Sequence, residues 1–159
     1  MNELKLIYSI FDQEVSHTLD FLAALEEKDW QMISQPWDSF LFHGLAKNVS
    51  VTEIIRHIVM LEHYVVDSIG SQENGAVLSL DGDEAICDQI QAKKDLVSYY
   101  KAVHEENLKK IINFRQSDLD KILMFVSQPY TGIGLLWMLT GHHAFHLGQL
   151  RSMTFSRTI

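Results

Sequence analysis

The sequence has a single cysteine, Cys87, in 159 residues, so it can form neither an internal disulfide nor a thiolate-rich metal site. We expect Cys87 to be structural, with a functional thiol as the alternative. Two prolines and eight glycines argue against long disordered tracts. No run of about twenty apolar residues could span a membrane, and the first residues lack the basic-then-apolar order of a secretory signal. These absences predict a cytoplasmic protein.

Basic residues are also scarce: 13 Lys and Arg stand against 21 Asp and Glu, which gives a net charge of −8. Binding to a phosphate backbone depends on clustered basic side chains. The adjacent lysines Lys93-Lys94 and Lys109-Lys110 are too few to reverse the overall charge. We therefore expect no nucleic-acid partner.

The length suits one domain over residues 1–159.

Apolar residues recur at steps of three and four, which is typical of amphipathic helices. The pattern predicts four long helices, over residues 3–28, 50–69, 86–114 and 131–155. The second begins with Ser50 and Glu53, which form a capping box, and Gly70 is its predicted stop. No segment predicts a strand. The sequence therefore indicates an all-α four-helix bundle with at least one long crossover, in the connection between helices 2 and 3.

A histidine cluster stands in the otherwise apolar last helix, at His142, His143 and His146. Residues four apart lie on the same side of a helix, so His142 and His146 can present two imidazoles to one metal ion. At 100° per residue these two share the sector of Leu135 and Leu139, which is predicted to face the core. His143 falls about 80° away, towards the helix edge, and is the weaker candidate ligand.

The third ligand is predicted to be His57, which lies on the flank of the apolar side of the second helix. His63 points the other way, and we expect it at the surface. Three imidazoles that converge in a core without an ion would leave polar nitrogens unpaired. The sequence therefore predicts a metal site formed by His57, His142 and His146.

Four further features each leave two interpretations. Glu62, on the apolar side of the second helix, either orients an imidazole or lies at a solvated bundle edge. Gln149 and Arg151 either contact a substrate or make surface and helix-end hydrogen bonds. Glycines at heptad spacing, Gly134, Gly141 and Gly148, permit either tight helix packing or close approach of a substrate.

The last-helix segment, with His142, His146 and the following Leu147-Gly148-Gln149, resembles the C-terminal signature of the DinB-like metalloprotein superfamily. His57 matches the position of that family's first histidine. The chain departs from the pattern at Leu147, where Arg is frequent, and at His143, where an acidic residue is common. The resemblance implies an up-down-down-up bundle, a divalent ion such as zinc or nickel on the three histidines, and activation of a low-molecular-weight thiol.

Three functions compete at this stage. The first is a metal-dependent enzyme with a small-molecule substrate, in which an open coordination position activates a thiol or water for transfer or hydrolysis. No residue in the sequence identifies a separate catalytic base. The second is a metal- or ligand-binding bundle without turnover. The third, a di-iron bundle, needs two Glu-x-x-His motifs, and only Glu14 to His17 has that form.

Apolar side chains, including Trp30, Trp37 and the nearly all-round apolar last helix, exceed what one small bundle can bury. A homodimer is therefore the expected state.

Overall fold

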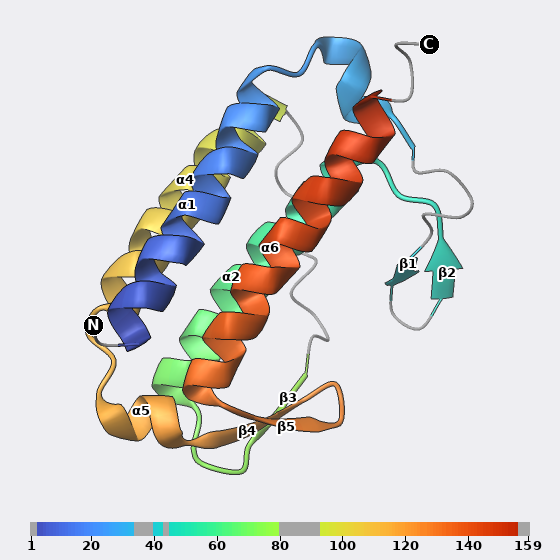
Figure 1. Cartoon of the computed structure of the whole chain (residues 1–159). Helices are drawn as coiled ribbons and strands as arrows, with labels where there is room; N and C mark the ends of the chain where they lie inside the picture. Colours follow the sequence, from blue (N-terminus) through green and yellow to red (C-terminus); the bar gives the residue numbers. More distant parts are fainter. Residues whose placement is uncertain (1–2, 34–39, 43–44, 80–92, 156–159) are drawn as a thin grey trace.

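Four long helices dominate the computed structural model, which describes residues 3–33, 40–42, 45–79 and 93–155 (Figure 1). They are α1 (Glu3–Ala23), α2 (Val51–Ser71), α4 (Lys93–Ile111) and α6 (Gly132–Phe155). Both α1 and α2 pack against α4 and α6. The predicted all-α class and four-helix bundle are therefore confirmed. None of the described helices is both long enough and apolar enough to cross a membrane.

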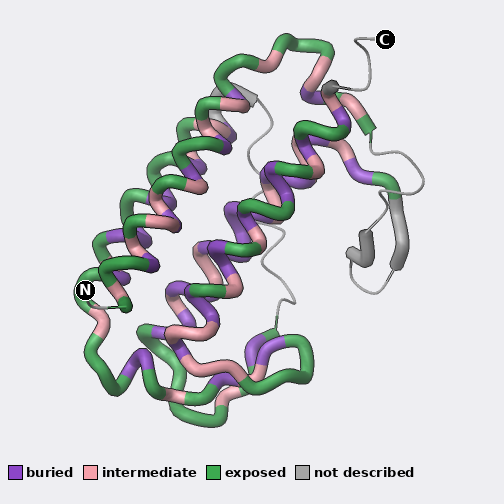
Figure 2. The backbone as a smooth tube through the Cα atoms, in the orientation of Figure 1, coloured by how far each residue is buried: buried purple, intermediate pink, exposed green. Residues whose placement is uncertain are grey.

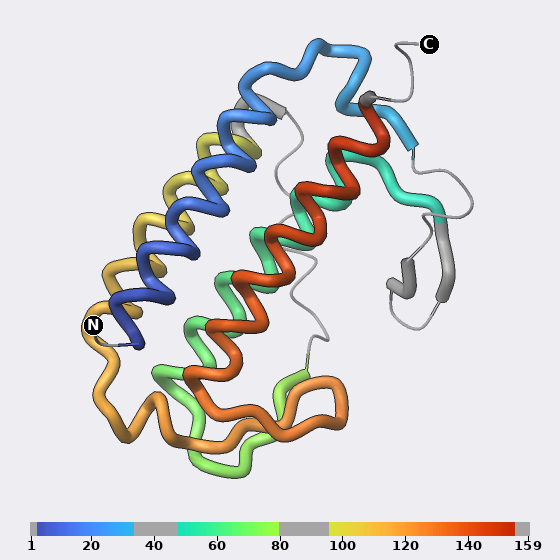
Figure 3. Tube along the Cα trace, viewed as in Figure 1, coloured from blue at the N-terminus to red at the C-terminus, as the bar shows by residue number. Residues whose placement is uncertain are grey.

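The colours of Figure 3 show the direction of each helix. In that view α1 and α6 run towards the upper end of the bundle, whereas α2 and α4 run towards the lower end. The long crossover predicted between the second and third helices falls partly outside the described residues. The chain after α2 is described as far as residue 79, and residues 80–92, which include Cys87, are not described.

A local signal accounts for the start of α2, whereas the ends of the first two helices differ from the prediction. The Ser50 hydroxyl accepts from the Glu53 amide at 3.2 Å, and Glu53 Oε2 accepts from the Ser50 amide at 2.8 Å, so the predicted capping box is confirmed. Gly70 does not stop α2, which continues to Ser71 with Gln72 as its C-cap. The first helix ends at Ala23, earlier than predicted, and a 3-10 helix, η1 (Glu27–Gln31), follows it.

The core is built from one stripe of each helix, and these stripes face one another in Figure 2. Apolar side chains that recur every three or four residues supply it. Its fully buried members include Ile7, Phe11 and Val15 of α1, Ile54, Ile58 and Val65 of α2, Leu96 and Tyr100 of α4, and Leu135 and Leu139 of α6.

Short strands occupy the connections, and the prediction of no strand is wrong. The hairpin β1 (Phe40–Phe42) and β2 (Leu45–Lys47) precedes α2. At the lower end of the bundle, β3 (Val77–Leu78) pairs in parallel with β4 (Ile122–Phe125), and β4 pairs antiparallel with β5 (Gln128–Thr131) (Figure 1). A five-residue helix, α5 (Gln116–Asp120), leads into β4.

The β4–β5 turn escaped prediction because it lacks the usual turn residues. Its two central residues, Val126 and Ser127, have φ angles of 49° and 62°. Tight hairpin turns with two positive φ angles strongly favour Asn-Gly, and a β-branched residue is strained there. Nothing in the local sequence therefore marks a turn.

The double variant Val126→Asn, Ser127→Gly is expected to raise the free energy of unfolding by about 1 kcal/mol, because it relieves this strain. Urea denaturation measures the change. Val77→Asn, another exposed valine of the same sheet, is the matched control and should bring no gain. Equal stability of the double variant and the unaltered chain would show that the turn carries no strain.

Candidate metal centre

Two helices bring three imidazoles together, namely His57 of α2 and His142 and His146 of α6. The Nε2 atom of His142 lies 3.0 Å from His57 Nε2 and 3.0 Å from His146 Nε2. One nitrogen from each ring fits within a mutual separation of 4.8 Å. Imidazole nitrogens bind zinc at about 2.0–2.1 Å, so two ligands of one ion lie roughly 3 Å apart. The three side chains named from the sequence thus meet with the spacing that a metal ion requires.

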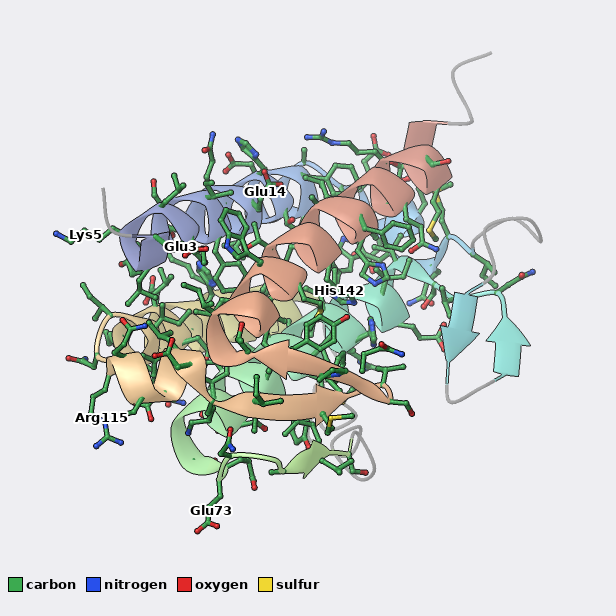
Figure 4. All side chains as sticks on the ribbon, turned by 60° about the horizontal axis from the view of Figure 1, so that its bottom comes forward. Glu3, Lys5, Glu14, Glu73, Arg115 and His142 are labelled. Carbon is green, nitrogen blue, oxygen red and sulfur yellow. The ribbon has the colours of Figure 1, made fainter. Side chains whose placement is uncertain are left out.

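The site lies where the bundle core meets its surface. His57 and His142 are partly buried, and His146 is 3% exposed. Figure 4 shows His142 beside α6, on the side of α2. Partial exposure gives His57 and His142 contact with solvent, while the two helices hold the rings in place.

Hydrogen bonds among the three imidazoles cannot satisfy all of their nitrogens. An imidazole nitrogen carries either a hydrogen or a lone pair, so His142 Nε2 cannot make two good hydrogen bonds to the neighbouring Nε2 atoms. If instead Nδ1 of His142 carried the hydrogen, that atom would have no acceptor, because it is buried without a hydrogen-bond partner among the described residues. A cation between the three rings accepts one lone pair from each Nε2 atom and so removes the conflict among these nitrogens, which fits a metal ion. His142 Nδ1 then carries the proton of its ring, without a hydrogen-bond partner among the described residues.

Burial keeps His142 and His146 neutral, which is the form that binds metals. Burial, together with the nearby imidazoles of His146, His57 and His143, lowers the pKa of His142 to about 2. Burial also lowers the pKa of His146, although the hydrogen bond to Gln149 opposes that change.

The free energy of unfolding of the metal-free protein is expected to fall as the pH drops from 6.5 to 5. Burial lowers the folded-state pKa of His142 to about 2 and of His143 to about 4, whereas unfolded imidazoles titrate near ~6.5. The unfolded chain therefore binds more protons below that pH, and each of these histidines costs up to about 1.4 kcal/mol per pH unit.

Urea denaturation at pH 6.5 and pH 5 measures this loss, above the range in which most carboxylates titrate. Phe145→Ala, which truncates an exposed side chain that does not titrate, should leave the slope unchanged. Identical stability of the metal-free chain at the two pH values would contradict the buried, neutral state of His142 and His143.

Gln149 orients one of the three rings. Its Oε1 atom accepts a hydrogen bond from His146 Nδ1 at 2.9 Å. A proton held on Nδ1 leaves the lone pair on Nε2, where a metal would bind. Of the two interpretations left open by the sequence, the structure gives Gln149 a hydrogen bond within its own helix.

His143 does not lie at the helix edge, and that prediction is wrong. Its side chain is 0% exposed, and its Nδ1 atom lies 2.8 Å from the Tyr100 hydroxyl of α4. The helical wheel failed because α6 is apolar on nearly every side, so the pattern gives no clear inward direction. His142 and His143 both point into the protein, towards different neighbours.

Glu62 is likewise not at a solvated edge, because its side chain is 0% exposed. It accepts hydrogen bonds from His104 Nδ1 at 2.8 Å and from Asn107 Nδ2 at 3.1 Å. The imidazoles beside it are His104 and His143, which are not members of the predicted metal triad. Sequence analysis missed His104 and Asn107, although a carboxylate on an apolar helix side was a signal that buried partners exist.

The remaining predicted positions are Arg151 and the glycines of α6. Arg151 lines a surface hollow with His17, Asp20 and Phe21 of α1. Added Cβ atoms at Gly141 and Gly148 would meet no described atom within 4 Å, so no close helix packing requires these glycines.

Comparison with known proteins rests on structure. No family sequence model matches the chain, and no curated protein sequence matches it. The mycothiol-dependent maleylpyruvate isomerase has a similar structure, with a TM-score of 0.68 and 12% identity; the match covers 92% of this chain and 60% of that one. This chain thus spans about 60% of the isomerase's length.

Two proteins of Bacillus subtilis are also similar. The DinB-like protein YjoA has a TM-score of 0.64 and 19% identity, over 96% of this chain and 94% of that one. YfiT, described as "a probable metal-dependent hydrolase with an unusual four-helix bundle topology", has a TM-score of 0.55 and 10% identity, over 94% and 82%. The resemblance seen in the sequence is confirmed at the level of structure: this chain has the four-helix bundle fold of the DinB-like proteins.

Proposed function

We propose that this chain binds one divalent metal ion through His57, His142 and His146, and that it is a metal-dependent enzyme acting on a small-molecule thiol or on water. The observation that carries the proposal is the convergence of three Nε2 atoms, with His142 3.0 Å from each neighbour. The neutral state of His142 and His146 and the hydrogen bond from His146 to Gln149 support it. Zinc and nickel both suit three imidazole ligands.

The residues of the chain have separable tasks. The three Nε2 atoms would bind the ion, and Gln149 would hold the His146 ring by its Nδ1 proton. A divalent cation with an open coordination position lowers the pKa of a thiol or water bound there, which makes a nucleophile near neutral pH. The three protein ligands leave at least one position of a tetrahedral ion free for that group.

Metal reconstitution with spectroscopy tests the proposal. The chain is loaded with zinc, nickel or cobalt, and elemental analysis should give about one ion per chain. Addition of a small thiol to the cobalt or nickel form should then change the visible absorption spectrum, because the thiol enters the coordination sphere. Negligible metal after reconstitution would refute the site.

A metal-binding bundle without turnover is the alternative. An ion that binds one per chain but exchanges neither water nor thiol would favour it, because an enzyme needs the open position. The di-iron alternative has less support, since His17 of its single motif is exposed and lines a surface hollow.

The homodimer and the cytoplasmic location remain predictions. Light scattering at micromolar concentration should give about twice the chain mass of 18.3 kDa. Among the described residues, Trp137 and Phe145 of α6 are large exposed apolar side chains that a second copy would cover, whereas Trp37 lies outside the described residues. A mass near that of one chain would exclude the dimer.

A further inference from the structure

A buried polar network lies beside the candidate metal centre and belongs to none of its ligands. The Glu62 carboxylate is at its middle, with hydrogen bonds from His104 and Asn107 of α4. His143 Nε2 faces Glu62 Oε2 at 3.4 Å, and Tyr100 contacts the other nitrogen of that ring. All five side chains are less than a tenth exposed.

The network reaches all four helices of the bundle. His104 Nε2 lies 3.4 Å from Asp12 Oδ1 of α1. The Phe11 ring, also on α1, packs edge-on against both His104 and His143, with centroid distances of 5.1 and 5.0 Å. Buried polar groups make directional contacts, so this network constrains how the helices are rotated relative to one another.

The chemistry of the contacts defines the orientation of His143. Burial and the charge of Glu62 raise the pKa of Tyr100 well above its usual value, so its hydroxyl stays protonated. The hydroxyl therefore donates a hydrogen bond to His143 Nδ1. The proton of the neutral ring is then on Nε2, which faces Glu62. Glu62 Oε2 and His143 Nε2 make no hydrogen bond within the described part of the chain, so their 3.4 Å approach is an electrostatic contact. It is the one polar contact that each of these two buried atoms makes among the described residues.

The metal centre and the polar network both use residues of α2 and α6. His143 directly follows His142, and successive residues of a helix project 100° apart, so holding one ring fixes the direction of the other. On α2, His57 and Glu62 are five residues apart on one rigid helix. Rotation of α6 that would move His142 away from His57 would therefore also break the contacts of His143 with Glu62 and Tyr100.

We propose that Glu62 and Tyr100 are positioning residues for the metal site: they hold His143, and through it the rotation of α6 that presents His142 and His146 to His57. This inference rests on the proposed metal-binding function. Mutation of residues that hydrogen-bond to metal ligands commonly lowers metal affinity by about 10–100-fold. Here Glu62 and Tyr100 would act on the rotation of α6 rather than directly on a ligand ring.

The test uses Tyr100→Phe and Glu62→Gln in the full chain, with competition against a chelator to measure zinc affinity. Each variant is expected to bind zinc about 10–100-fold more weakly than the unaltered chain. The cobalt-loaded variants should also show an altered visible spectrum, because the three nitrogens no longer share the same geometry. Tyr100→Phe removes one oxygen only and keeps the ring, so it provides the test even if Glu62→Gln fails to fold.

Two controls separate positioning from general destabilisation. Tyr130→Phe makes the same chemical change on β5, and Ile111→Val weakens the core of α4 without touching a polar group. Both should keep the zinc affinity and the cobalt spectrum of the unaltered chain. Normal binding and spectra in Tyr100→Phe and Glu62→Gln would overturn the positioning role, and so would losses no larger than that of Ile111→Val. Failure of the unaltered chain to bind zinc would instead refute the metal site itself.

Discussion

His142→Ala is expected to bind zinc more than about 100-fold more weakly than the unaltered chain, since loss of a mere outer partner already costs about 10–100-fold. His142 Nε2 is the central donor, at 3.0 Å from both other Nε2 atoms. Its removal leaves two nitrogens that no longer have a common neighbour. His57→Ala and His146→Ala should have effects of the same size, because three protein ligands are the usual minimum of a catalytic zinc site.

The matched control is His63→Ala on α2, six residues after His57. His63 is partly exposed and pairs with Asp67 at 3.4 Å, so its removal should leave about one ion per chain. Chelator competition and elemental analysis on the four variants give the answer. Retention of the ion by His57→Ala, together with its loss from His63→Ala, would show that a different face of α2 binds the metal.

Phe11→Ala is expected to lower the free energy of unfolding by about 3–5 kcal/mol. Phe11 is 0% exposed, and its ring supports His104 and His143 at the centre of the bundle. Truncation removes apolar burial and leaves a cavity next to buried polar groups. Urea denaturation of the metal-free protein measures the loss.

The control for this variant is Phe145→Ala on α6, whose ring is 62% exposed. Its change in the free energy of unfolding should stay within about 0.5 kcal/mol, as is usual for surface substitutions. If the two variants lost equal stability, the core would not be centred on Phe11.

The features that were predictable from the sequence depend on the spacing of residues within one helix. The Ser50–Glu53 capping box needs only residues three apart, and the pairing of His142 with His146 needs only residues four apart. Apolar periodicity predicts α1, α2 and α4 in the same way, whereas α6 is apolar on nearly every side. These features depend on one helix at a time, so no knowledge of the neighbouring helices was required.

What the sequence could not predict depends on partners that lie far along the chain. Glu62 is buried with His104 and Asn107, more than forty residues later, which donate hydrogen bonds to one oxygen of its carboxylate. His143 points inward because it contacts Tyr100 and Glu62 there. The helical wheel could not predict this, since α6 is apolar on nearly every side. Contacts of this kind are decided by how the helices pack.

The two helices of the metal centre meet through His57 and His142, which are 85 positions apart in the chain. An ion shared by these side chains acts as a reversible cross-link that exists only when the chain is folded. Its contribution to stability grows with the free ion concentration and reaches about 2.7 kcal/mol at one hundred times the dissociation constant. For a chain of this size that is a rise in melting temperature on the order of 5–10 °C. Thermal melting can therefore rank zinc, nickel and other divalent ions as occupants of the site without any substrate in hand.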